Sequence, residues 1–282
     1  AVRGGFLLCA LAPWLVPREQ LPLVLVVIWT LKTLPDVVGI PSWTAVMARA
    51  VSPRRRAQLN GTRWALLSLV SAASSALFGW LLDQIAFPLN YQVVFFISFA
   101  LSSLDMVFFA RIKVPPLERT ELARTGNVWA RFAEYLRPVS QYKPFLVFLS
   151  ATLLYRLALN LPAPLFSVFW VNHLQAPDTL IGLRGTVGHL SLVAGYIAWG
   201  RLANHIGHRR VLRISALGLG LYPILTALSP TPAWLFPAAF VWGITASGVD
   251  IGLFDLMLAA CPTHRQPLFA AVWSIAANAA IF

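Results

Sequence analysis

Nine apolar runs constrain this chain more than any other feature. A helix needs about 20 apolar residues to cross the hydrocarbon core of a bilayer. Hydrophobic residues make up 58% of the chain and charged residues only 11%, whereas soluble domains carry about 25% charged residues. The sequence therefore predicts an all-α, polytopic membrane protein. The runs are 4–15, 21–47, 64–82, 91–109, 145–171, 181–199, 211–228, 234–260 and 267–282.

The basic residues mark alternate loops between these runs. Most of the 22 lysines and arginines lie within 49–63, 111–143 and 201–213, or at Arg3 and Arg265. Positive residues collect on the cytosolic side of a membrane, so the pattern predicts nine helices in the inner cell membrane. The net charge of +12 does not indicate a nucleic-acid partner, because the basic residues punctuate apolar runs and form no single basic surface.

The longest polar stretch, 113–144, is the predicted linker between two domains, 1–112 and 145–282. The loop alternation places it in the cytoplasm. Within it, Trp129 and Phe132 share one helical face, opposite Arg131 and Glu134. This pattern is typical of an amphipathic helix lying on the membrane surface.

The two predicted domains share a weak internal repeat, in the same order and the same membrane orientation. At offsets of 209 and 210 residues, identical residues coincide in two neighbouring blocks. Parallel repeats of this kind occur in some transporter folds. The coinciding pairs include Pro53 with Pro262, Trp64 with Trp273, Arg3 with Arg213, and Pro13 with Pro223.

A glycine-rich basic turn, GRLANHIGHRR at 200–210, joins two of the apolar runs. It resembles the motif G-x-x-x-D-R-x-G-R-R of the major facilitator superfamily, with His205 and His208 at two of the arginine positions. Glycines at this spacing allow a tight turn and close helix approach. The resemblance implies a structural and gating role for the turn; the residues concerned are Gly200, Asn204, Gly207, Arg209 and Arg210.

The resemblance to this superfamily covers the whole chain and implies more about it. It implies a bacterial-type secondary transporter with two six-helix bundles, of which the nine runs are helices three to eleven in a fragment lacking both ends. It also implies a small-molecule substrate, a lipid bilayer around a monomer, and no cofactor. The bundle parts are then 1–112 with helices three to six, and 145–282 with helices seven to eleven.

Five polar residues lie deep in three of the predicted spans. An ionised side chain at mid-bilayer costs roughly 2.5 to 3.5 kcal/mol, so each needs a partner, water or a function. Residues four apart share a helix face, which pairs Lys32 with Asp36 and Arg156 with Asn160; Asp250 is in another span. In the superfamily, helices four, seven and ten line the central cavity, so the resemblance implies that all five face the substrate and ion pathway. Purely structural ion pairs are the alternative.

Three further ionisable residues are weaker candidates. Asp105 and Asp255 lie toward the cytosolic ends of their spans, where pairing with the basic turns explains them. His189 could titrate near neutral pH, although a satisfied histidine at a helix interface explains it as well. Cys9 and Cys261 have no metal-ligand spacing, so the sequence predicts neither a metal site nor a disulfide framework.

The sequence therefore favours alternating-access transport of a small solute. Because Asp36 and Asp250 lie deep in their predicted spans, we hypothesise that one of them couples transport to proton movement. A non-transporting scaffold or receptor on the same fold is the alternative. An intramembrane enzyme is less favoured, because Asp250 and Asp255 are about 140° apart around a helix and do not converge as a catalytic pair would. No catalytic residue is predicted.

Overall fold

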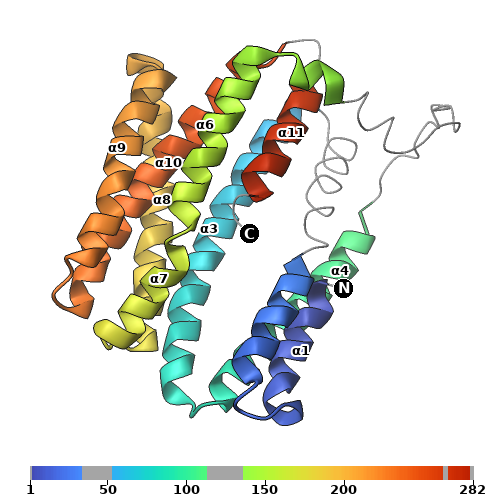
Figure 1. Cartoon of the computed structure of the whole chain (residues 1–282), viewed down its shortest axis with the longest axis vertical. Coiled ribbons are helices and arrows are strands. Elements are labelled where there is room, and N and C mark those ends of the chain that lie inside the picture. Colours follow the sequence, from blue (N-terminus) through green and yellow to red (C-terminus); the bar gives the residue numbers. More distant parts are fainter. Residues whose placement is uncertain (1, 34–52, 113–135, 263–265, 280–282) are drawn as a thin grey trace, which may run out of the picture. The chain divides into compact units, whose positions relative to one another are not determined.

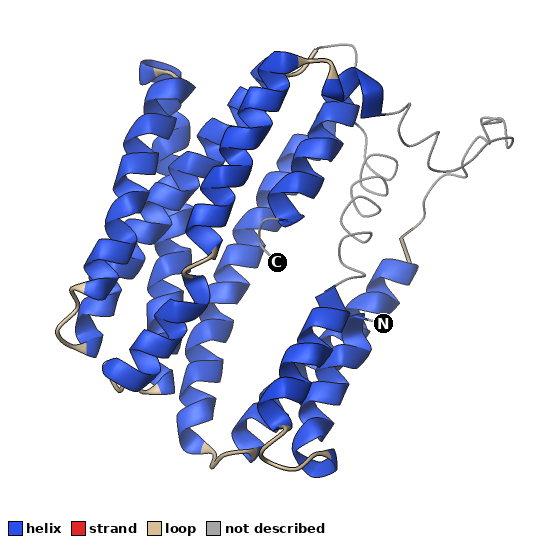
Figure 2. Cartoon of the chain, in the orientation of Figure 1, coloured by secondary structure: helices blue, strands red, loops and turns tan. Residues whose placement is uncertain are grey.

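A computed structural model of the protein describes residues 2–33, 53–112, 136–262 and 266–279, and every regular element within these ranges is a helix (Figure 2). Asp36 and most of the predicted linker, including its amphipathic segment, lie outside the described residues. The boundaries of the predicted domains remain predictions. Figure 1 labels the helices in chain order.

Six of the described helices are long and apolar enough to cross a membrane, and shorter apolar helices accompany them, including Leu21–Thr33. The prediction of a polytopic, all-α membrane protein is confirmed. In the first part of the chain, the helices are α1 (Val2–Leu15), α3 (Pro53–Gln84) and α4 (Leu89–Ala110). In the second part, they are α6 (Lys143–Asn160), α7 (Ala163–Val168), the π-helix Phe169–His173, α8 (Asp178–Ile206), α9 (His208–Ala227), the 3₁₀ turn Pro232–Trp234, α10 (Leu235–Ala260) and α11 (Gln266–Ala279).

The described helices group into two compact units. Unit 1 comprises residues 1–115 together with 176–186, and unit 2 comprises 116–175 and 187–282. The long helix α8 therefore contributes its first turns to unit 1 and the remainder to unit 2. Each unit has its own packing.

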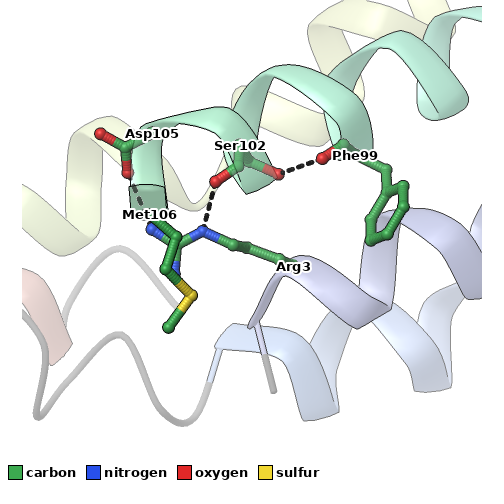
Figure 3. Close-up of polar contacts among 5 residues, drawn as sticks. All are labelled: Arg3, Phe99, Ser102, Asp105 and Met106. Atoms are coloured by element: carbon green, nitrogen blue, oxygen red, sulfur yellow. Dashed lines mark hydrogen bonds and ion pairs between the residues drawn. The ribbon is translucent and has the colours of Figure 1, made fainter. Parts of the chain in front are cut away.

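In unit 1, α1 packs against α4 through polar contacts at both ends of their interface. The Gln92 side-chain amide donates to the carbonyl of Ala10 over 3.1 Å. At the other end, Nη2 of Arg3 lies 2.7 Å from a carboxylate oxygen of Asp105, and Nε of Arg3 donates to the Ser102 carbonyl (Figure 3). The Asp105 side chain is 69% exposed, so this pair stabilises the unit only modestly.

In unit 2, aromatic and aliphatic side chains tie α6, α10 and α11 together. Phe145 of α6 and Phe269 of α11 are fully buried and meet edge to face, with ring centroids 4.8 Å apart. Met257 of α10 and Cys261 join the same buried cluster. Edge-to-face contact adds about 0.5 to 1.5 kcal/mol to burial, so this cluster holds the ends of three helices in register.

The fifth predicted run, 145–171, is interrupted near its middle. Helix α6 ends at Asn160, and the chain resumes as α7 at Ala163 after Pro162. Proline lacks the amide that would continue the helical hydrogen bonds, and the side-chain amide of Asn160 donates to the Arg156 carbonyl over 2.8 Å. A π-helical turn follows α7, and such turns are frequent at functional sites.

The glycine-rich basic turn is shorter than the sequence indicated. Helix α8 continues through Gly200 and Asn204 to Ile206, and α9 begins at His208. Gly207 alone breaks the helix, with φ at +83°, a backbone conformation that favours glycine. A side chain added at Gly200 would meet no atom of the described residues within 4 Å, so Gly200 is neither part of the turn nor a close packing contact among them.

Candidate functional site

Arg156 and Asp250 lie next to each other in unit 2, on α6 and α10. Nη2 of Arg156 is 3.7 Å from a carboxylate oxygen of Asp250. This separation is within ion-pair range but exceeds a direct hydrogen bond. The two side chains are 23% and 43% exposed. The pair therefore leaves both groups partly open to further ligands.

Close packing between α8 and α10 brings a third residue to the pair. A Cβ atom at Gly243 would lie 2.4 Å from the Gly188 carbonyl, and one at Gly195 would lie 3.1 Å from Cα of Ile244. Small residues let helix backbones approach this closely in membranes. The indole of Trp199 donates to the Ile244 carbonyl over 2.7 Å and fixes the approach one turn further on. Gly243 and Ser247 of α10 therefore belong to a helix-packing surface against α8.

This approach places Tyr196 against Asp250. The Tyr196 hydroxyl donates to a carboxylate oxygen of Asp250 over 3.0 Å. Tyrosine hydroxyls usually find a partner when buried, and the Asp250 carboxylate accepts here on one oxygen while its other oxygen faces Arg156. Tyr196 was not predicted from the sequence, because one tyrosine in an apolar span is ordinary. Its position beside Gly195 was the available signal.

The guanidinium of Arg156 has spare hydrogen-bonding capacity. Its Nε atom is buried and has no partner within the part of the chain that the structure describes. A buried donor left unpaired costs about 1 to 3 kcal/mol, and more when it is charged. A water or polar group would recover that cost only by reaching the buried Nε atom itself, whereas the exposed part of the guanidinium is open to a ligand. The cluster of Arg156, Tyr196 and Asp250 can therefore bind an acceptor group and exchange a proton at its carboxylate.

The other predicted pathway residues lie elsewhere. Asn160 is on the same helix as Arg156, but its amide donates to the helix backbone. Lys32 belongs to unit 1, is 91% buried, and places its ammonium 4.1 Å and 4.0 Å from the ring centroids of Phe6 and Trp29. Aromatic faces attract a desolvated cation. No carboxylate among the described residues pairs with Lys32, and its predicted partner Asp36 lies outside them.

One residue at the basic turn forms an ion pair with α10, and the other polar residues of the turn are exposed. His208, the first residue of α9, forms an ion pair with Asp255 of α10 when it is protonated, in line with the expected pairing of that aspartate with the turn. Asn204, Arg209 and Arg210 are exposed. His189 lies half-buried within α8. The turn thus connects α9 to α10 through His208, and its gating role stays a prediction.

The apolar spans define the class of protein as a multi-pass helical membrane protein, and Arg156 and Asp250 lie within two of these spans. The sequence model of the Major Facilitator Superfamily matches residues 2–282, so the chain belongs to this superfamily. Its members are secondary transporters and not enzymes, and a bilayer and a small-molecule substrate follow from membership. No curated protein sequence matches the chain.

Proposed function

We propose that the protein moves a small solute across the inner cell membrane as a monomer by alternating access, with proton movement coupled to transport at Asp250. One observation carries this proposal: three polar side chains from α6, α8 and α10 converge within apolar spans, and one buried donor is left unpaired. Ionisable residues at membrane depth are costly, and such groups mark substrate and proton pathways in transporters.

The geometry supports separate roles for the three residues. Arg156, whose side chain is 23% exposed, offers guanidinium N–H donors to an acceptor group of the solute. Asp250 can alternate between a pair with Arg156 and a protonated, neutral state. Tyr196 keeps one oxygen of the Asp250 carboxylate oriented by its hydrogen bond. A solute that binds Arg156 would compete with Asp250 for the guanidinium, and this competition would couple solute binding to protonation.

The test is uptake by the purified full chain in proteoliposomes. Radiolabelled sugars, amino acids, carboxylates and organic cations are supplied with and without an inward proton gradient. At least one solute should accumulate in response to the gradient, and the Asp250→Asn variant should lose that accumulation while still exchanging solute across the membrane. Asp105→Asn is the matched control, because Asp105 is also ion-paired but 69% exposed at a helix end; it should accumulate solute as the parent does.

Two outcomes would overturn the proposal. If Asp250→Asn keeps both the rate and its dependence on the proton gradient, then coupling at Asp250 is wrong. If no solute of any class crosses the membrane in the parent protein, then the alternative of a non-transporting scaffold or receptor is favoured.

A further inference from the structure

The first turns of α8 make a close contact with α3 inside unit 1. A Cβ atom at Gly182 would lie 2.2 Å from the Ser75 carbonyl and 2.9 Å from Cα of Gly79. A Cβ atom at Gly79 would in turn lie 2.6 Å from the Asp178 carbonyl. The two backbones therefore touch where Gly79 and Gly182 face each other, and neither position has room for a side chain.

Polar contacts run along the same interface from both helices. The Thr186 hydroxyl donates to the Ala72 carbonyl over 2.6 Å. At the other end of the contact, the Asp83 carboxylate accepts from the backbone amides of Asp178 and Thr179, over 3.0 Å and 2.8 Å. The interface is thus closed at its end by one side chain of α3 that binds the start of α8.

Asp83 acts as the N-terminal cap of a helix to which it does not belong in sequence. The first amides of any helix lack partners within that helix, and a negative charge near them is stabilised by the helix dipole. Side chains that cap helices usually come from the residue that precedes the helix. In this protein the cap comes from 95 and 96 residues earlier in the chain, so it fastens one helix to another.

We propose that Asp83 is a latch that holds the start of α8 against α3 and stabilises the closed state of one membrane face. A rearrangement that separates the start of α8 from α3 must release both hydrogen bonds to Asp83. The loops at this end of α3 and α8, 85–88 and 174–177, carry no Lys or Arg. The latch therefore lies on the face away from the basic loops, which is the outer face.

This latch rests on the alternating-access function proposed above, but it can be measured without a known solute. The amides of Asp178 and Thr179 precede the first backbone hydrogen bonds of α8, which Leu180 and Ile181 donate to the Pro177 carbonyl. Their protection from hydrogen exchange thus depends on Asp83. Asp178→Ala is the matched control, because it removes a negative charge at the same helix end and keeps the backbone amide that Asp83 binds.

The first experiment is hydrogen-exchange mass spectrometry on the full chain, read from peptides that cover residues 176–181. Asp83→Ala should accelerate exchange of the two amides about tenfold, Asp83→Asn should have a smaller effect because its amide keeps one acceptor oxygen, and Asp178→Ala should match the parent. Melting followed by tryptophan fluorescence checks that each variant is folded. Exchange in Asp83→Ala that equals the parent's would overturn the latch.

The second experiment measures opening at the outer face. A cysteine replacing Ser75, which lies beneath Gly182, is labelled with a membrane-impermeant maleimide added from outside. Labelling should be several-fold faster when Asp83→Ala is combined with this cysteine, and unchanged with Asp178→Ala. If solute uptake proceeds and labelling is independent of Asp83, the latch is wrong and the transport proposal stands. If Asp83 controls labelling while no solute is carried, the latch is supported and the transport proposal is wrong.

Discussion

Replacing Gly182 with alanine should force α3 and α8 apart. The added Cβ would lie 2.2 Å from the Ser75 carbonyl oxygen, and every atom it meets belongs to the backbone. This separation is about 1.3 to 1.8 Å short of ordinary van der Waals contact. Backbone cannot rotate out of the way as a side-chain end can, so the whole helix must shift.

The expected loss of stability is measured against a control substitution on the same helix. Gly200 also lies inside α8, and a Cβ there would meet nothing within 4 Å in the part of the chain that the structure describes. Both substitutions gain the same helix propensity, about 1 kcal/mol for glycine to alanine, so their difference isolates the steric cost. Overpacking typically costs about 1 to 3 kcal/mol. A loss of 1 kcal/mol lowers the melting temperature of a large domain by about 2 to 4 °C. Gly182→Ala should therefore melt about 2 to 12 °C below Gly200→Ala.

The assay is thermal unfolding of the purified chain in detergent, followed by the fluorescence of its 11 tryptophans. Gly182→Ala should also expose the cysteine at position 75 to labelling, as release of the Asp83 latch does. If Gly182→Ala and Gly200→Ala melted at the same temperature, the close contact between α3 and α8 would be refuted.

Three further predictions concern the polar pairs. Tyr196→Phe should lower stability by about 0.5 to 1.5 kcal/mol through loss of one hydrogen bond, and should change the pH profile of uptake more than the maximal rate; an unaltered pH profile would count against its role beside the intramembrane carboxylate. A double-mutant cycle between Arg3 and Asp105, read by thermal unfolding, should give a coupling of about 0.2 to 1 kcal/mol, as exposed pairs do, and a coupling above 2 kcal/mol would contradict it. Asp255→Asn should lower the free energy of unfolding by about 0.2 to 1 kcal/mol, because it weakens the contact with His208. Arg210→Ala removes an exposed charge from the same turn and should leave the melting temperature unchanged.

The arrangement of spans was open to prediction because apolar length and loop charge act along the sequence. A bilayer admits only segments that satisfy their own backbone hydrogen bonds, so the apolar runs within the described residues had to become helical. The interruption after Asn160 had a local signal in Pro162. The continuation of α8 through Gly200 had none, because a single glycine lowers helix propensity without breaking a helix.

The polar contacts between helices were harder to predict. Arg156 and Asp250 drew attention because charges in apolar runs are rare, but their separation depends on how α6 and α10 cross. Tyr196 and Asp83 gave no such signal, since a tyrosine within a span and an acid at its end are both common. Their partners lie 54 and 95 residues away, and only the close approach of glycines across two helix pairs brings them into reach.

The central claim is that Asp250 faces an aqueous pathway and not lipid. The most direct measurement is labelling of an Asp250→Cys variant in membranes with a charged, water-soluble thiol reagent. The native Cys9 and Cys261 are buried and should contribute little background. Leu217→Cys on α9, whose side chain is 79% exposed in an apolar span, is the lipid-facing control. If Asp250 faces an aqueous pathway, we expect rapid labelling at position 250 and none at position 217. Failure to label at both positions would contradict an aqueous pathway at Asp250.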